Sequence, residues 1–91
     1  MTYATFMEWE VDWETHLRID KAVGDEPVDG MLVHASGPSD SGTRSLDLWE
    51  SKEHATRFFN ERIMPALASL GIEAGPPQAM MDFDAEIFRT A

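Results

Sequence analysis

Residues 30–50 contain two short runs of β-forming residues on either side of a turn cluster. The first run is GMLVHAS, residues 30–36, and the second is TRSLDLWE, residues 43–50. The stretch GPSDSG between them is rich in glycine, proline and serine, which favour turns. This pattern predicts an antiparallel hairpin. The segments on either side of the hairpin therefore show what kind of sheet it belongs to.

The segment before the hairpin has the pattern of a strand followed by a helix. Residues 2–10 are rich in aromatic and β-branched residues, which favour a strand. Asp12 can cap a helix whose first turn carries Glu14, a favourable charge near the positive end of the helix dipole. We expect this helix to cover residues 13–23 and to end at Gly24.

The segment after the hairpin predicts a second helix and a fourth strand. Ser51 can cap a long helix that carries one broad apolar stripe and ends at Gly71. Pro65 lies inside this pattern, and because proline lacks a backbone N–H, we expect a kink near Ile63. Residues 79–89 alternate apolar with acidic residues, which is typical of a strand.

The predicted order of elements is β-α-β-β-α-β, which is the order of the ferredoxin-like fold. In this α+β fold, a four-stranded antiparallel sheet carries both helices on one face. The 91 residues fit a single domain over residues 1–91. A chain this short buries only about 60–65% of the surface that its unfolded form exposes, so its core is thin. Association with a second copy would increase that burial.

Charge and composition exclude several classes of function. The chain carries 17 acidic and 7 basic residues, a net charge of −10, and has no basic stripe that would favour nucleic acid or an anionic membrane. It contains no cysteine, which excludes disulfides and thiolate chemistry and fits a cytoplasmic protein. The N-terminal residues lack the pattern of a signal peptide, and no apolar run is long enough to span a bilayer.

Alternation along the strands predicts which side chains face the helices. We expect the purely apolar set to pack on the helices, namely Ala4, Phe6, Met31, Val33, Ala35, Leu46 and Leu48. The opposite set then points to the open face of the sheet, namely Tyr3, Thr5, Met7, Trp9, Leu32, His34, Ser36, Ser45, Asp47 and Trp49. In the fourth strand, Met81, Phe83, Ala85 and Ile87 fit either face.

The predicted open face carries more apolar area than a protein leaves in water. A second copy is the simplest cover, which predicts a homodimer with a cavity between the two sheets or between sheet and helices. The aromatic residues of this face then form either the dimer core or the walls of a pocket for a small hydrophobic or aromatic ligand. The candidate substrate-binding residues are Tyr3, Met7, Trp9, Leu32 and Trp49.

The hairpin supplies a candidate catalytic pair, His34 and Asp47. A register that places residue 34 opposite 47 also places 32 opposite 49 and 36 opposite 45. An aspartate beside a histidine orients the ring and keeps it basic, so that His34 can act as a general base on an acidic C–H or O–H group. The alternative is a structural cross-strand hydrogen bond.

The remaining polar residues have weaker functional patterns. We expect His16 and His54 at the surface or at a boundary of the core. No spacing of histidine and carboxylate residues matches a metal site, and no glycine motif matches a nucleotide site, so we expect no metal and no cofactor. We expect Asp82, Asp84 and Glu86 to form a solvated edge on the fourth strand.

The segment from the hairpin through the second helix resembles the small dimeric α+β barrel proteins related to the antibiotic biosynthesis monooxygenases. Their pattern is a G-x-x-x-H strand, a glycine-bearing turn, a strand ending D-x-W-E-S, and a helix with spaced F, R, P-A-L and G. The matching residues, over about half of the chain, are Gly30, His34, Gly42, Asp47, Trp49, Glu50, Ser51, Phe58 or Phe59, Arg62, Pro65 and Gly71.

This resemblance implies a homodimer with a barrel formed from both sheets, but it selects no single activity, because one fold hosts many. Members include cofactor-independent monooxygenases of aromatic polyketides, polyketide cyclases and haem-degrading proteins. The acidic composition disfavours the haem activity, which needs a basic site for propionates. Two interpretations remain. One is an enzyme without a cofactor that uses His34 and Asp47 on an aromatic or polyketide-like metabolite, and the other is a non-catalytic dimer that binds a ligand or a protein.

Overall fold

A computed structural model describes residues 2–73 and 75–91 of the chain. Its elements confirm the predicted order, with the second helix divided into three parts. They are β1 (Thr2–Trp9), α1 (Trp13–Val23), β2 (Met31–Ser39), β3 (Gly42–Trp49), α2 (Lys52–Phe58), η1 (Phe59–Ile63), α3 (Met64–Leu70) and β4 (Ala79–Ala85). None of the helices in these described residues is long and apolar enough to span a membrane.

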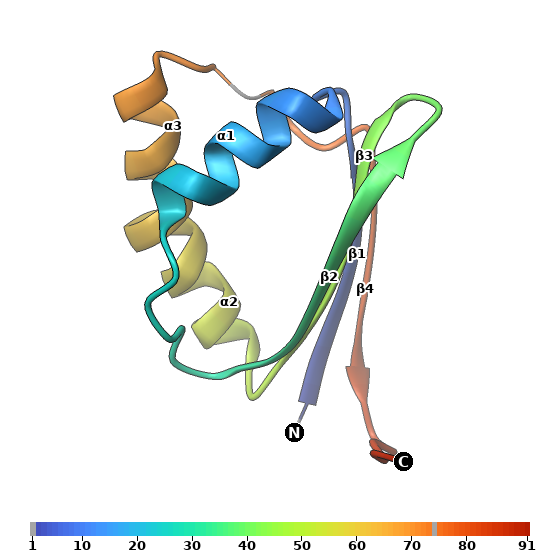
Figure 1. Cartoon of the computed structure of the whole chain (residues 1–91). Helices are drawn as coiled ribbons and strands as arrows, with labels where there is room; N and C mark the ends of the chain where they lie inside the picture. The colour runs from blue at the N-terminus through green and yellow to red at the C-terminus, as the bar shows by residue number, and fades with distance from the viewer. Residues whose placement is uncertain (1, 74) are drawn as a thin grey trace.

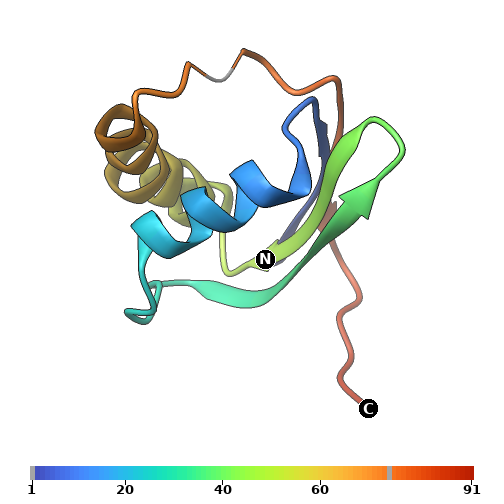
Figure 2. The ribbon, with the colours of Figure 1, turned by 45° about the horizontal axis from the view of Figure 1, so that its top comes forward.

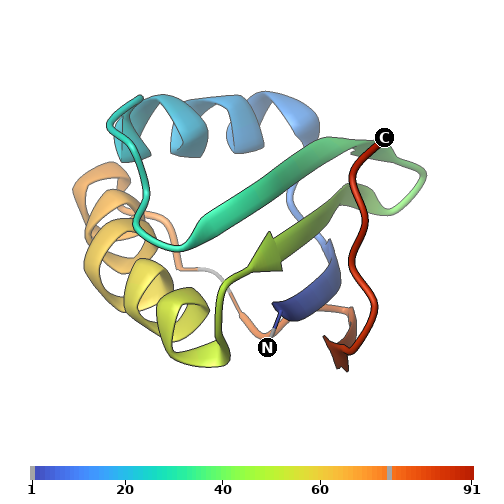
Figure 3. The same cartoon turned by 90° about the horizontal axis from the view of Figure 1, so that it is seen from below.

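The four strands form one antiparallel sheet in the order β2-β3-β1-β4. The helices lie on one side of this sheet and leave the other side bare, as Figure 1 shows. α1 packs beside α3, and the segment after α3 crosses the end of the sheet to reach β4 (Figure 2). Seen from below in Figure 3, the C-terminal segment beyond β4 lies on the side away from the helices. This arrangement is the predicted ferredoxin-like α+β fold.

Local sequence accounts for the ends of the helices. Asp12 caps α1 by accepting a hydrogen bond of 2.7 Å from the backbone N–H of Thr15. Ser51 caps α2 by accepting a 3.3 Å hydrogen bond from the backbone N–H of His54. Gly71 ends α3 with a φ of 67°, a left-handed conformation that strains residues with a Cβ. These caps satisfy backbone groups that have no partner within the helix.

The expected kink before Pro65 takes the form of a π-helical turn. In η1 the turn widens, so that the N–H of Met64 donates to the carbonyl of Phe59, five residues earlier. Proline has no N–H to donate, and its ring crowds the carbonyl four residues before it. The wide turn accommodates the proline, and α2 and α3 continue as one bent helical segment (Figure 1).

The hairpin turn is tighter than the turn cluster predicts. β2 continues through Gly37, Pro38 and Ser39, and only Asp40 and Ser41 form the turn. Pro38 is tolerated because β2 is at the edge of the sheet, where a proline can be accommodated. The predicted six-residue turn was wrong because glycine, proline and serine favour turns without excluding an edge strand.

The prediction of which side chains face the helices is wrong. Trp49 packs against Phe58 of α2, with ring centroids 5.3 Å apart, and Ser36 contacts His16 of α1. Because side chains alternate along a strand, the set expected on the open face lies beneath the helices, apart from Leu32. The set expected beneath the helices, apart from Met31, lies on the bare face, namely Ala4, Phe6, Val33, Ala35, Leu46 and Leu48.

The physical reason for this error is that both faces of the sheet carry large apolar side chains. The apolar content of a face therefore does not show which set the helices cover. β4 adds Met81 and Phe83 to the bare face, where they are 65% and 64% exposed, and Ile87 lies beyond the end of this strand. The buried hydrophobic residues among those described are few, as expected for a thin core, namely Tyr3, Ala4, Trp49, Ala66 and Leu67.

Candidate functional site

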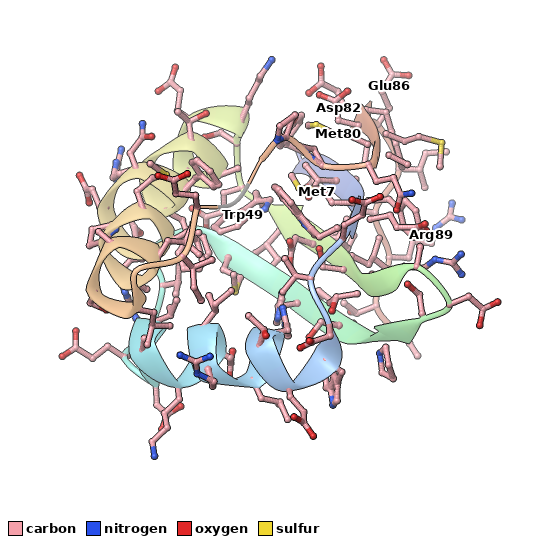
Figure 4. The ribbon with its side chains drawn as sticks, turned by 90° about the horizontal axis from the view of Figure 1, so that it is seen from above. Met7, Trp49, Met80, Asp82, Glu86 and Arg89 are labelled. Atoms are coloured by element: carbon pink, nitrogen blue, oxygen red, sulfur yellow. The ribbon has the colours of Figure 1, made fainter. Side chains whose placement is uncertain are left out.

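A cavity of about 190 Å³ lies between the sheet and the helices. Figure 4 labels two of its lining residues, Met7 and Trp49, which lie in the space between the helices and the strands. The apolar lining residues are Met7, Trp9, Val11, Ile19, Trp49, Ala55, Phe58, Phe59, Ile63, Met64 and Leu67. Such a lining is typical of a site for a small hydrophobic molecule.

A few polar side chains converge on the same cavity. They are Thr5, His16, His34, Ser45 and Asp47, of which only His16 comes from a helix. A small number of polar groups in an apolar cavity is the usual composition of a small-molecule site. Among residues 2–73 and 75–91, no group of three or more histidine, cysteine or acidic side chains is placed to hold a metal ion.

His34 and Asp47 form the predicted cross-strand pair. The register places them directly opposite each other on β2 and β3, and Nδ1 of His34 is hydrogen bonded to Oδ1 of Asp47. This hydrogen bond raises the pKa of His34 above its ordinary value, although partial burial of the ring opposes the shift. In the neutral ring, Nδ1 donates to the carboxylate and Nε2 carries the lone pair that can accept a proton. The pair therefore has the arrangement of an oriented general base.

The register of the hairpin is confirmed for residue 36 opposite 45 but not for residue 32 opposite 49. Met31 pairs with Trp49, because Leu32 is an extra residue in a β-bulge before Val33. The side chain of Leu32 is 41% exposed on this edge strand. A bulge of one residue is not visible in an alternating sequence pattern, so the expected pairing of Leu32 was wrong.

Tyr3 lies on the helix-covered face but directs its hydroxyl toward β4. The side chain is buried, and its hydroxyl donates a hydrogen bond of 2.5 Å to Oδ2 of Asp82. Burial and this carboxylate raise the pKa of Tyr3 to about 12. The acids of the C-terminal strand region are exposed as predicted, and Figure 4 shows Asp82 and Glu86 at the outer edge.

The structure brings five of the seven predicted site residues into one cavity, namely His34, Asp47, Met7, Trp9 and Trp49. Tyr3 and Leu32 have the other environments described above. The five residues stay together although the predicted face was wrong, because alternation and cross-strand pairing keep the residues of one face together whichever face the helices cover.

His16, expected at the surface or at a boundary, is a cavity residue. Its Nε2 lies 3.3 Å from Oγ of Ser36, and its ring stacks on Trp13 with centroids 5.1 Å apart. Burial lowers the pKa of His16, so this ring stays neutral to lower pH than a free histidine. One signal was available in the sequence, since Trp13, His16 and Ile19 are spaced by three residues and share one face of a helix.

His54 has a structural role at the start of α2. Its Nδ1 lies 2.6 Å from Oγ of Ser51, the residue that caps this helix. Gly30 packs so closely on His54 that an added Cβ would lie 2.2 Å from ring carbon Cδ2. Gly30 also has a φ of 80°, so its position requires glycine for two reasons.

A second hollow of about 460 Å³ adjoins the cavity. Trp9, Val11 and Gly75 line both spaces, which places the two side by side. Glu10 and Glu73 are among the residues that line the second hollow, which is more polar than the cavity.

No protein-family model and no curated protein matches the sequence significantly. Solved structures match the fold. A proposed antibiotic biosynthesis monooxygenase from Chloroflexus aurantiacus J-10-fl superposes with a TM-score of 0.71 at 9% identity, over 99% of this chain and 98% of that chain. Rv0793 from Mycobacterium tuberculosis superposes with a TM-score of 0.69 at 11% identity, over 99% of this chain and 100% of that chain. A proposed antibiotic biosynthesis monooxygenase from Deinococcus radiodurans superposes with a TM-score of 0.58 at 15% identity, over 100% of this chain and 98% of that chain.

The chain has the ferredoxin-like α+β fold of these solved structures. The agreement extends over nearly the whole length of both chains in each comparison, so it is a match of the fold rather than of one motif. It confirms the predicted resemblance at the level of the fold. Identities of 9% to 15% carry no information about a substrate, so the activity has to be inferred from the site itself.

Proposed function

We propose that this protein binds a small aromatic or polyketide-like molecule in the cavity and removes a proton from it with His34. The observation that carries the proposal is the oriented His34–Asp47 pair in the wall of a largely apolar cavity. An imidazole held by a carboxylate in such a place is a candidate for acid–base catalysis. The apolar lining of the cavity supports a hydrophobic ligand of this class.

The size of the cavity favours a ligand of one or two fused rings. In another protein, an apolar cavity of about 150 Å³ binds benzene, and the cavity here is about 190 Å³. Trp9 and Phe58 line the cavity with aromatic rings on which an aromatic ligand can stack. The second hollow beside Trp9 offers room for a polar substituent.

Proton transfer to His34 starts the proposed reaction. An acidic O–H or C–H group of the ligand gives its proton to Nε2, and Asp47 stabilises the imidazolium that results. The ligand is left as an electron-rich phenolate or carbanion. Such a carbanion can add dioxygen and take the proton back from His34 as a hydroperoxide, which loses one oxygen atom as water and leaves the other as a carbonyl on the ring. Alternatively, it can attack a carbonyl group of the same molecule and close a ring, with the alkoxide taking the proton from His34.

We also propose that a second copy covers the bare face of the sheet. Val33 and Leu46 are 40% and 46% exposed there, on the same side as Met81 and Phe83. These side chains come from three strands and form one apolar surface, which monomeric proteins seldom leave in water. Two sheets packed face to face would bury this surface. The cavity of each subunit lies on the other side of its sheet and would remain available to a ligand.

A second candidate function is ligand binding without catalysis, and the charge of His34 favours it. Because the hydrogen bond with Asp47 raises the pKa of His34, more of these rings are protonated near neutral pH than for a free histidine. An imidazolium in an apolar cavity can bind an anionic oxygen but cannot remove a proton. Both functions use the same cavity, and turnover distinguishes them.

Turnover of a hydroxylated naphthalene separates the two functions. The test ligand is 1,8-dihydroxynaphthalene, with binding followed by tryptophan fluorescence without oxygen, and turnover by oxygen uptake and mass spectrometry. Catalysis predicts protein-dependent turnover that falls by about 10²–10⁴-fold in His34→Ala, the usual loss for a general base. The matched control His54→Gln should retain it. Binding without turnover in the native protein would support the second function, and absence of binding would contradict both.

A further inference from the structure

The cavity holds a second imidazole, that of His16, which the proposed proton transfer does not use. His16 projects from α1 and lines the cavity together with His34 and Asp47. Its Nε2 lies 3.3 Å from Oγ of Ser36, and its ring stacks on Trp13 with 16° between the ring planes. These two contacts hold the ring on the β2 side of the cavity.

Ser36 determines how close the two imidazoles lie. His34 and Ser36 are two residues apart on β2, so their side chains share one face and their backbone positions are about 6.6 Å apart. Because His16 contacts Ser36, its ring lies beside the ring of His34 rather than across the cavity. A bicyclic ligand can therefore reach both rings along a single edge.

The surroundings of the two rings favour different charges. The hydrogen bond with Asp47 on β3 raises the pKa of His34, whereas burial lowers the pKa of His16. Asp20 on α1 and Asp47 oppose the lowering at His16 only in part, and His34 adds to it, because neighbouring imidazolium rings repel. Two titratable groups whose surroundings move their pKa values apart are typical of acid–base sites.

We propose that the ligand carries two oxygen atoms on one edge of its ring system, and that His34 contacts the first oxygen while His16 binds the second. The cavity would then select molecules with this pair of oxygen atoms. This inference rests on the proposed function, because it adds a contact within the same site. A neutral imidazole can donate its N–H to a carbonyl or hydroxyl oxygen. When His34 takes the proton of a hydroxy-ketone, negative charge spreads to the carbonyl oxygen, and the hydrogen bond from His16 strengthens with that charge.

The affinities of two naphthols test this role. 1,8-Dihydroxynaphthalene carries two hydroxyl groups on one edge, whereas 1-naphthol has the same rings and only one hydroxyl. We expect the native protein to bind the dihydroxy compound about fivefold to tenfold more tightly, the effect of one net hydrogen bond. His16→Phe keeps an aromatic ring to stack on Trp13 but cannot hydrogen bond, so the two compounds should bind equally. His16→Gln retains a side-chain donor and should retain a preference for the dihydroxy compound.

Binding is measured anaerobically by tryptophan fluorescence, and circular dichroism checks that each variant is folded. His54→Gln, a substitution outside the cavity, should keep the native preference. If His16→Phe does not fold, Ser36→Ala replaces it, because it removes the contact that holds the ring and should lower the preference. If the native protein binds 1-naphthol without preferring the dihydroxy compound, or if His16→Phe keeps the preference, this role of His16 is wrong while the proposed function stands. If the native protein binds neither compound, the proposed function fails and this inference fails with it.

Discussion

His34 and Asp47 face each other across β2 and β3, and a hydrogen bond between Nδ1 and Oδ1 joins them beneath the helices. The Asp47 side chain is 15% exposed and that of His34 is 37% exposed. The pair joins the edge strand β2 to the interior of the sheet. It therefore couples the stability of the hairpin to the protonation of the candidate catalytic base.

Stability is expected to fall as the pH rises through the raised pKa of His34. A histidine whose pKa is higher in the folded chain than in the unfolded chain binds its proton more tightly when folded. The stabilising contribution of His34 is therefore complete below its ordinary pKa of about 6.5, and it is lost as the pH passes the folded-state value. Thermal unfolding at several pH values measures this dependence. Asp47→Asn should flatten it, and an unchanged dependence in Asp47→Asn would contradict the role of the pair.

His16 is expected to have the opposite effect, in a different pH range. Because burial lowers its pKa in the folded chain, the unfolded chain binds the proton first as the pH falls. The contribution of the neutral His16 ring to the free energy of unfolding is therefore complete above about pH 6.5, and it is lost as the pH falls through the folded-state pKa. NMR titration should show His16 below and His34 above the ordinary value. Both rings titrating at the ordinary value in the folded protein would be inconsistent with the structure.

The bare face of the sheet predicts a dimer that one charge disrupts. Native protein should sediment with the mass of two chains. Leu46 is 46% exposed in the single chain, so Leu46→Glu should leave the fold intact while it places a carboxylate in the apolar surface and produces monomers. Ala22→Glu changes an exposed residue of α1 and should remain dimeric. Native protein that sediments as a single chain would refute this interface.

Gly30→Ala and Gly37→Ala are expected to differ sharply in stability. At Gly30, a Cβ would meet the ring of His54 at 2.2 Å, and the φ of 80° strains any residue other than glycine. We expect a loss of about 2–4 kcal/mol in the free energy of unfolding, from the strain and the overpacking together. At Gly37 nothing lies within 4 Å of an added Cβ, so the change should stay within about 0.5 kcal/mol. Urea unfolding measures both, and similar losses would contradict this account.

Tyr3 should ionise at unusually high pH. The chain has one tyrosine, so ultraviolet absorbance follows this hydroxyl alone. Its pKa of about 12 lies above the ordinary 10, so the unfolded chain loses its proton first, and stability should fall as the pH rises between these values. Asp82→Asn should lower the midpoint of the titration. A midpoint at the ordinary value while circular dichroism remains native would show that the hydroxyl is not held by Asp82.

The sequence by itself determined the order of the elements and their approximate ends. Asp12 and Ser51 cap helices, and Pro65 bends one, through backbone hydrogen bonds and steric contacts within a few residues. Alternation within each run also grouped His34 and Asp47 apart from the purely apolar residues. These features depend on neighbours along the chain, so a sequence pattern is enough to predict them.

Only the tertiary structure decided which face of the sheet the helices cover. Both sets of side chains are apolar enough to be buried, so the choice depends on how the helices pack across the sheet as a whole. The same packing brought His16 to Ser36 and formed the cavity beside His34. The bulge at Leu32 is likewise a property of the assembled sheet, because it changes the pairing of two strands without changing the alternation within either.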